Sequence, residues 1–231
     1  MIKQNFTSIA IFADSQVGLN LVNWINEKYK GDISILFTTK ENEIYYWAKK
    51  IGLNVHIYRN ESEYIELLKK YDLKIKLGFL IWWPFIIKEE IIRSSLNGFV
   101  NTHPSLLPFN RGKHPSFWAL KEQCPFGVSL HKVDMGIDNG EIISQSSIDY
   151  NWEDNGETLY IKSKEEMQKL FKRQYPKLRA LKFKSLPQKL SQGSFHLASE
   201  INNASSLNLD EEMENRIAGA VGFNMRTGDY H

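Results

Sequence analysis

Short apolar runs alternate with helical patterns through the first third of the chain, and this alternation constrains the fold more than any other feature. The apolar runs cover residues 7–13, 33–37, 54–58 and 77–83. Between the first two runs, Leu21, Trp24 and Ile25 recur at helical spacing. Strands that are apolar throughout, separated by helices, are typical of a parallel sheet covered on both faces. The pattern predicts an α/β fold with an open, mostly parallel twisted sheet.

The second half of the chain continues this pattern and then changes character. Residues 99–101 start another strand, and residues 127–133 and 141–150 alternate as strands do. Asp154 with Glu157 predicts the cap of a further helix, which Pro176 is expected to end or kink. Polar residues become frequent from Ser185. We therefore predict a Rossmann-like domain over residues 1–186 and a C-terminal extension over residues 187–231, either a β-hairpin or a dimer contact.

Composition excludes several classes of protein. Lys plus Arg total 29 and Asp plus Glu total 27, so the formal charge is +2 and gives no electrostatic footprint for nucleic acid. Cys124 is the single cysteine, which excludes an intramolecular disulfide and a thiolate zinc site. No stretch approaches the roughly 20 apolar residues of a membrane span, and no signal peptide is recognisable. The expectation is a cytoplasmic protein without a membrane or nucleic-acid partner.

The turn after the first strand does not match the common phosphate-binding loops. It supplies Gly18 alone, whereas the dinucleotide fingerprint needs three glycines, and the Gly-Lys-Ser/Thr ending of a P-loop is missing. These differences disfavour a NAD dehydrogenase and a P-loop kinase. Asp14 and Ser15 in this turn are predicted to be ordinary turn and N-cap residues.

Three polar residues are the candidates for catalysis. Asn101 and His103 lie two apart at the end of a predicted strand, so their side chains share one face. Ligands of open α/β sheets bind outside the carboxyl ends of the strands. Asp138 lies in a Gly-containing turn between two later strands. Together they offer an amide donor, a base that titrates near neutral pH and a carboxylate to orient it.

These residues belong to a longer string that resembles the formyltransferase family that uses 10-formyltetrahydrofolate. The family's string reads Asn-x-His-Pro-Ser-Leu-Leu-Pro, followed by His-x6-Asp-x-Gly, and residues 101–108 and 131–140 match its two halves. The resemblance implies that Asn101, His103 and Asp138 are catalytic in moving a formyl group from folate to a primary amine, without a metal. His131 is predicted to be structural. The resemblance extends more loosely over residues 7–178 and implies the formyltransferase fold.

The resemblance also assigns binding residues. Residues 78–84 match the segment that lines the pterin slot, so Leu80, Trp82, Trp83 and Ile86 are predicted to contact the folate, although either tryptophan could instead be a core residue. The loop with Asp134, Gly136 and Ile137 is expected to close the other side of the slot. The remaining predicted contacts, to the acceptor substrate, are Ser105, Arg111 and Lys113. The two cations suit a pyrophosphate.

The acceptor follows from similarity and elimination. The Gly-Ser-Asn loop of glycinamide ribonucleotide enzymes is replaced by residues 14–18. Residues after Leu178 are too few for the extra domain of the methionyl-tRNA enzymes, and the regulatory domain of the formyl-folate hydrolases is not recognisable. The prediction is therefore a homodimeric enzyme that formylates a nucleotide-linked amino-dideoxy sugar for a surface polysaccharide such as lipopolysaccharide O-antigen.

Other functions stay open at this point. Glycinamide ribonucleotide or another small amine is the alternative acceptor. A folate- or nucleotide-binding module without catalysis would require the three candidate residues to be misplaced, and a plain interaction domain would bind no folate. The sugar, its nucleotide and the position of the amine do not follow from the sequence.

Overall fold

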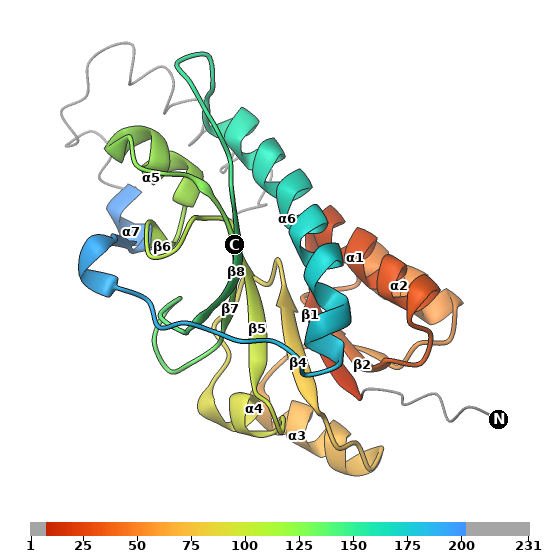
Figure 1. Ribbon diagram of the computed structural model, residues 1–231. Helices are drawn as coiled ribbons and strands as arrows, with labels where there is room; N and C mark the ends of the chain where they lie inside the picture. The colour runs from red at the N-terminus through yellow and green to blue at the C-terminus, as the bar shows by residue number, and fades with distance from the viewer. Residues whose placement is uncertain (1–7, 202–231) are drawn as a thin grey trace. The chain divides into compact units, whose positions relative to one another are not determined.

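A computed structural model describes residues 8–201 of the chain, which divide into two compact units (Figure 1). Within the described residues, unit 1 comprises residues 8–102, Lys132–Met135 and Gln174–Phe183. Unit 2 comprises His103–His131, Gly136–Arg173 and residues 184–201. The chain crosses from one unit to the other several times, so neither unit is one continuous stretch of sequence.

Unit 1 is built on five parallel strands in the order β3-β2-β1-β4-β5. Their bounds are β1 (Ile9–Ala13), β2 (Ile33–Thr38), β3 (Val55–Ile57), β4 (Leu77–Ile81) and β5 (Phe99–His103). Every residue of the central strands β1 and β4 is buried, as expected for strands covered on both faces. The predicted α/β fold with a mostly parallel sheet is thereby confirmed.

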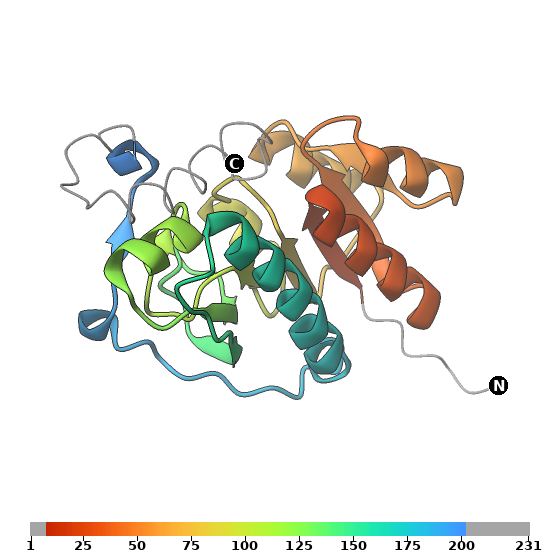
Figure 2. The ribbon, with the colours of Figure 1, turned by 90° about the horizontal axis from the view of Figure 1, so that it is seen from above.

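Helices of unit 1 cover both faces of these strands. The helices are α1 (Ser15–Lys28), α2 (Glu43–Lys50), α3 (Glu61–Lys70) and α4 (Glu89–Arg93). α3 and α4 pack on the face that carries Phe12 and Phe37, whereas Trp24 of α1 and Tyr175 pack on the face of Phe79. Figure 2 shows α1 on one side of these strands and α3 on the other. Asp14 is the N-cap of α1, as predicted.

Unit 2 contains an antiparallel strand pair and a short parallel pair. Its elements are β6 (Arg111–Gly112), α5 (Pro115–Glu122), β7 (Gly127–Lys132), β8 (Ile142–Ser147), η1 (Leu190–Gln192), β9 (Phe195–His196) and α7 (Ala198–Ile201). β7 pairs with β8, and β6 pairs with β9. A small apolar core joins α5 to Phe126 and Leu159.

Helix α6 (Gly156–Arg179) contributes to both units and runs through Pro176, which therefore does not end it. The predicted extension contains one described strand, β9, which forms a parallel pair with β6 of the same chain. Residues 202–231 of that extension lie outside the described residues, and the boundary at residue 187 stays a prediction. No helix within residues 8–201 is both long and apolar enough to cross a membrane.

Candidate active site

Asp138 of unit 2 lies in the loop between β7 and β8, and its side chain is largely buried, with 14% of its surface exposed. Its backbone is left-handed, with φ 51°. The Gly112 N–H donates to Asp138 Oδ2 at 3.0 Å. Gln188 Nε2 donates to the main-chain carbonyl of Asp138 at 2.8 Å. Hydrogen bonds from two other segments of unit 2 therefore fix both the side chain and the main chain of this residue.

Two histidines contact this one carboxylate. His103 Nδ1 lies 3.5 Å from Asp138 Oδ2, and His131 Nε2 lies 3.4 Å from Asp138 Oδ1. The two imidazole rings are nearly perpendicular, with centroids 6.2 Å apart. His103 is 5% exposed and His131 is 2% exposed, so the three side chains interact with little screening by solvent. The structure thus brings His103 and Asp138 together, as their assignment to one site requires.

Burial and charge act in opposite directions on these groups. Burial alone would raise the pKa of the Asp138 carboxyl, but the charge of His103, the contact with His131 and the Gly112 N–H together lower it well below its usual range. Burial is also the largest influence on His103 and lowers the pKa of its imidazole, while Asp138 opposes that shift. The carboxylate therefore stays ionised, and a proton on His103 is stabilised mainly by that carboxylate.

The environment of the His103 ring defines where it holds protons. His103 Nε2 lies 3.1 Å from the main-chain carbonyl of Asn110. Both neighbours of the ring are acceptors, so protonated His103 can donate from Nε2 to the Asn110 carbonyl and from Nδ1 to the Asp138 carboxylate. Nδ1 then faces the Asp138 carboxylate and can gain or lose a proton there. The arrangement suits a group that accepts and returns a proton during a reaction.

A buried hydrogen-bond network fixes the loop after His103. The Ser105 hydroxyl donates to the Phe109 carbonyl at 2.8 Å, and the Ser105 carbonyl accepts from Ser129 at 2.7 Å. Gln145 Nε2 donates to the Leu107 carbonyl and to Ser129 Oγ, each at 2.8 Å. Ser105 is fully buried, so the described contacts of its side chain are to this loop. Its predicted role as a substrate ligand stays a prediction.

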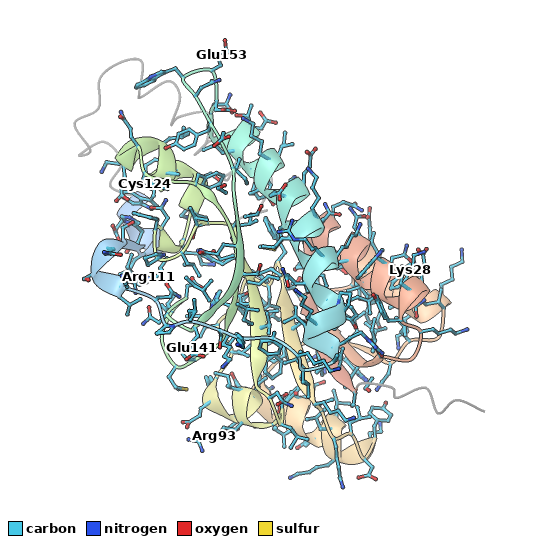
Figure 3. The ribbon with its side chains drawn as sticks, in the orientation of Figure 1. Lys28, Arg93, Arg111, Cys124, Glu141 and Glu153 are labelled. Atoms are coloured by element: carbon cyan, nitrogen blue, oxygen red, sulfur yellow. The ribbon has the colours of Figure 1, made fainter. Side chains whose placement is uncertain are left out.

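The two predicted cations lie on or beside β6, in the same unit as Asp138. Arg111, which Figure 3 labels, donates to Asn139 Oδ1. Its guanidinium lies over the Phe195 ring, with Cζ 5.8 Å from the ring centroid. Within the described residues, the buried Nε of Arg111 has no hydrogen-bond partner. Burial lowers the pKa of the Lys113 ammonium, and the Asp138 carboxylate opposes that shift. Both cations are thus partly withdrawn from solvent.

Most residues assigned to the pterin lie in unit 1, with Leu80 in β4 itself and Trp82, Trp83 and Ile86 in the segment after it. The Trp82 N–H donates to Thr102 Oγ1 at 2.9 Å, and that hydroxyl donates to the Leu80 carbonyl at 3.1 Å. Trp83 packs against Phe12, with ring centroids 5.3 Å apart, and belongs to the edge of the core. Ile86 is 72% exposed. Residues of the loop predicted to close the slot are divided between the units, with Asp134 in unit 1 and Gly136 and Ile137 in unit 2.

Asn101, the third candidate catalytic residue, is the middle residue of β5 and is half-buried in unit 1. It precedes His103 by two positions on one strand, so both side chains point to the same side of β5. The catalytic roles of Asn101, His103 and Asp138 stay predictions.

Three residues that contact this cluster were not predicted from the sequence. They are Asn110, whose carbonyl accepts from His103, Gly112, whose N–H binds Asp138, and Gln188, which holds the Asp138 main chain. Asn110 and Gly112 have positive φ, and the string Asn-Arg-Gly was a signal for such a turn. Gln188 carried no comparable signal.

The cluster combines a buried carboxylate, two imidazoles and nearby cations, which is a donor set for proton transfer and for binding an anionic group. Within residues 8–201, no group of three or more His, Cys, Asp or Glu side chains is arranged to hold a metal ion.

Comparison with known proteins places the chain in a family context. The family model for formyl transferase matches residues 35–174, more than half of the chain. The bifunctional polymyxin resistance protein ArnA of Wigglesworthia glossinidia brevipalpis is 36% identical over 104 residues, which are 45% of this chain and 16% of that protein. The methionyl-tRNA formyltransferase of Thermodesulfovibrio yellowstonii is 36% identical over 100 residues, which are 43% of this chain and 32% of that protein. The chain thus spans less than a third of the length of these relatives.

Solved structures share the fold over most of the chain. A 4-N formyltransferase from Francisella tularensis is 21% identical with a TM-score of 0.76, covering 92% of this chain and 88% of that one. An N-formyltransferase from Helicobacter canadensis, solved with folinic acid and dTDP-3-aminofucose, is 21% identical with a TM-score of 0.75, covering 93% and 81%. A phosphoribosylglycinamide formyltransferase from Bacillus halodurans is 25% identical with a TM-score of 0.62, covering 71% and 91%.

Proposed function

Because the chain belongs to the formyl transferase family, we propose that it transfers a formyl group from 10-formyltetrahydrofolate to the primary amine of a nucleotide-linked amino-dideoxy sugar. The observation that carries the proposal is that the Asp138 carboxylate lies 3.5 Å from the ring of His103. His103 is the last residue of β5, the strand that also contains Asn101. A formyl transfer needs hydrogen-bond donors for an oxyanion and a group that moves one proton, and these residue types supply both.

The residues have distinct parts in this reaction. The donor molecule supplies the formyl carbon, to which the amine nitrogen bonds as the bond from that carbon to the folate nitrogen breaks. The Asn101 amide donates a hydrogen bond to the formyl oxygen as it becomes negative, and protonated His103 donates a second one when its Nε2–H turns from the Asn110 carbonyl to that oxygen. One such donor is typically worth about 3 kcal/mol of barrier. Asp138 stabilises the protonated form of His103. It thereby assists the transfer of one proton from the attacking amine to the departing folate nitrogen.

Residues after β4 suit a folate ring. Trp83 Nε1 is buried and has no hydrogen-bond partner within the described residues. An indole N–H without an acceptor in the protein fits the polar edge of a bound heterocycle, and Leu80 and Trp82 supply apolar surface next to it in the sequence. We propose that this segment binds the pterin of the formyl donor, with Ile86 as an exposed wall residue and Asp134, Gly136 and Ile137 in the closing loop.

The proposed acceptor rests on two supports. Structural neighbours include enzymes solved with nucleotide sugars, such as the protein from Helicobacter canadensis. Arg111 and Lys113 provide two cations in the unit that holds Asp138, and the guanidinium geometry suits a pyrophosphate. Ser105 is proposed to contribute to the same substrate through the loop that it holds in place.

Glycinamide ribonucleotide is the second candidate acceptor, because a phosphoribosylglycinamide formyltransferase is among the structural neighbours. One observation in unit 1 argues against it. Asp14 Oδ1 accepts from the Ser15 N–H at 2.6 Å at the start of α1, and Thr39 and Asn42 donate to the same carboxylate. A negative charge already occupies this helix N-terminus, so it would repel a substrate phosphate there.

The setting of the enzyme is also part of the proposal. Apolar side chains that remain exposed in the described C-terminal segment, including Leu186 and Leu197, suit a contact with a second copy, and we propose a homodimer. The single cysteine, Cys124, is compatible with the reducing cytoplasm. Formylated amino sugars of this kind would serve a surface polysaccharide such as O-antigen.

Turnover with a panel of amines tests the proposed function. Purified protein is mixed with 10-formyltetrahydrofolate and, separately, dTDP-, GDP- and UDP-linked amino sugars, glycinamide ribonucleotide and methionyl-tRNA, and both tetrahydrofolate release and the formylated product are measured. We expect one nucleotide sugar to be formylated and the His103→Asn variant to be inactive on it. Preferential formylation of glycinamide ribonucleotide, or no turnover with any amine, would refute the proposal.

A further inference from the structure

The segment that follows α6 runs along the loop that carries Asp138, and both lie in unit 2. We call residues 185–188 the strap. The Ser185 hydroxyl donates to Glu141 Oε2 at 2.6 Å. Leu186 and Ile142 exchange main-chain hydrogen bonds of 2.8 Å and 2.9 Å. These contacts fix the strap beside the start of β8, three and four residues after Asp138.

Gln188 extends this contact to Asp138 itself. Its carboxamide nitrogen donates to the main-chain carbonyl of Asp138 at 2.8 Å and to that of Gly140 at 2.7 Å. An NH2 group has two hydrogens, so one side chain can satisfy both carbonyls at once. This fork fixes the main chain on either side of Asn139, which is itself the acceptor of a hydrogen bond from Arg111.

The conformation of Asp138 requires such support. Its φ of 51° lies in the left-handed region, which is uncommon for a non-glycine residue and is held in place here by the surrounding contacts. A relaxed main chain at this position would turn the carboxylate away from its present contacts. The two carbonyl hydrogen bonds of Gln188 are therefore placed where they control the direction of the Asp138 side chain.

A second anchor acts on the side chain of Asp138. Gly112, whose N–H binds Asp138 Oδ2, is fixed by the pairing of β6 with β9, in which the Lys113 N–H donates to the His196 carbonyl at 3.0 Å. A Cβ at Gly112 would lie 2.2 Å from that carbonyl oxygen, so only glycine allows this approach. Asp138 is thus held from its side chain by β6 and from its main chain by Gln188.

We propose that Gln188 is a positioning residue of the active site, which sets the Asp138 carboxylate against His103 without touching the substrate. The proposal rests on the proposed function, because it assigns Gln188 a part in that reaction. It extends the site to the segment after α6, 85 residues after His103 and 50 residues after Asp138.

The variant Gln188→Met tests this assignment, because methionine has a similar length and cannot donate a hydrogen bond. We expect kcat to fall by about tenfold to 100-fold, since small misplacements of a reacting group have effects of this size, while KM for both substrates changes by less than about twofold. The pH limb of kcat that depends on His103 should move to lower pH, because the Asp138 charge that favours protonated His103 has moved away. Gln192→Leu is the matched control, because Gln192 is exposed in the neighbouring η1, and it should behave as the wild type.

A measurement on the protein without substrates separates this proposal from the proposed function. The imidazole resonances of His103, assigned by their loss in His103→Asn, are titrated by NMR in the wild type and in Gln188→Met. We expect the midpoint to fall in the variant. This result supports the positioning of Asp138 even if no amine is formylated, which would refute the proposed function alone. An unchanged His103 titration overturns the assignment, whether or not kcat falls. Gln188→Leu replaces Gln188→Met in all measurements if the latter does not fold.

Discussion

Two buried carboxylates, Asp32 in unit 1 and Asp138 in unit 2, are held in contrasting ways. Arg179 donates to the two oxygens of Asp32 at 2.6 Å and 2.8 Å, and the Tyr175 hydroxyl donates a third hydrogen bond at 3.0 Å. Asp138 lies between the two imidazoles and accepts from one main-chain N–H. Near neutral pH, guanidinium and phenol keep their protonation states, whereas an imidazole can change its own.

The difference shows how a carboxylate can have a structural role in unit 1 and a role in proton transfer in unit 2. The hydrogen bond to Asp32 raises the already high pKa of Arg179, and burial raises that of Tyr175, so this triad has a fixed charge. It ties α6 to the turn before β2 and offers no proton for exchange. Asp138 instead stabilises a proton that can leave His103. A buried carboxylate therefore indicates function only when its partners titrate.

The largest expected effect is on catalysis, from Asp138→Asn. The amide keeps the shape but not the charge, so protonated His103 loses its main stabilisation. We expect kcat for formyl transfer to fall by about 1,000-fold, equivalent to about 4 kcal/mol of barrier, with little change in melting temperature. Steady-state kinetics and thermal unfolding measure the two quantities.

The control for this variant is Asp72→Asn, an exposed aspartate of unit 1 that is also left-handed, with φ 48°. It should leave both quantities unchanged. If Asp138→Asn kept more than about a tenth of the wild-type kcat, Asp138 would not have the catalytic role that distinguishes it from Asp32.

The next largest effect is on stability, from Arg179→Met. This variant removes the guanidinium from Asp32, which is 1% exposed, and leaves the carboxylate as a buried charge that keeps the hydrogen bond from the Tyr175 hydroxyl. We expect the free energy of unfolding to fall by about 3 kcal/mol, because removing one partner of a buried pair uncovers the desolvation cost of the other. The kcat per folded molecule should not change. Urea unfolding with kinetics at low temperature provides both values.

Arg173→Met is the matched control on the same helix, because Arg173 is exposed, and its effect should stay within about 0.5 kcal/mol. A loss of activity in Arg179→Met that exceeds its loss of folded protein would contradict a purely structural role for the Asp32 triad.

Much of the fold follows from the sequence because it depends on local periodicity. The apolar runs in residues 7–83 predicted the first four strands, and all four are present. Asp14 was predicted as a cap and is one. Pro176 was predicted to end or kink this helix, but α6 continues to Arg179. Tyr175 and Arg179, on either side of the proline, both bind Asp32 and hold the last turn in place. That anchor joins residues 143 and 147 positions apart, so no local pattern contains it.

The same reasoning separates the predictable part of the site from the rest. His103 and Asp138 belong to a long, specific string, and the structure places them 3.5 Å apart. Gln188 acts through a carboxamide on main-chain carbonyls, which any sequence provides, over a separation of 50 positions. Gly112 acts through its N–H. Contacts made by or to the main chain have no side-chain signature, so such residues become visible only when the chain is folded.

A smaller effect on stability is expected from Tyr175→Phe. The ring contacts of Tyr175 with Tyr29 and Phe79, at centroid distances of 4.9 Å and 5.8 Å, are kept, and the hydrogen bond from its hydroxyl to Asp32 is lost. We expect the free energy of unfolding to fall by about 1.5 kcal/mol, as for a hydrogen bond to a charged group, with no change in kcat. A loss as large as that of Arg179→Met would mean that the Tyr175 hydroxyl stabilises the Asp32 charge as much as the Arg179 guanidinium does.

The smallest expected effect is in the pH dependence of stability, where the two carboxylates should again differ. Burial lowers the pKa of His103 in the folded protein, so the unfolded chain binds this proton more readily. The stability that neutral His103 contributes is complete above its unfolded pKa of about 6.5 and is lost as pH falls from there towards the lowered folded value. Replacing the imidazole in His103→Gln removes this loss.

Between about pH 7.5 and pH 5.5 the wild type should therefore lose more stability than His103→Gln. Tyr175→Phe should follow the wild-type slope, because neither Tyr175 nor Arg179 titrates in this range. Equal slopes for the wild type and His103→Gln would show that burial does not lower the pKa of His103 in the folded protein.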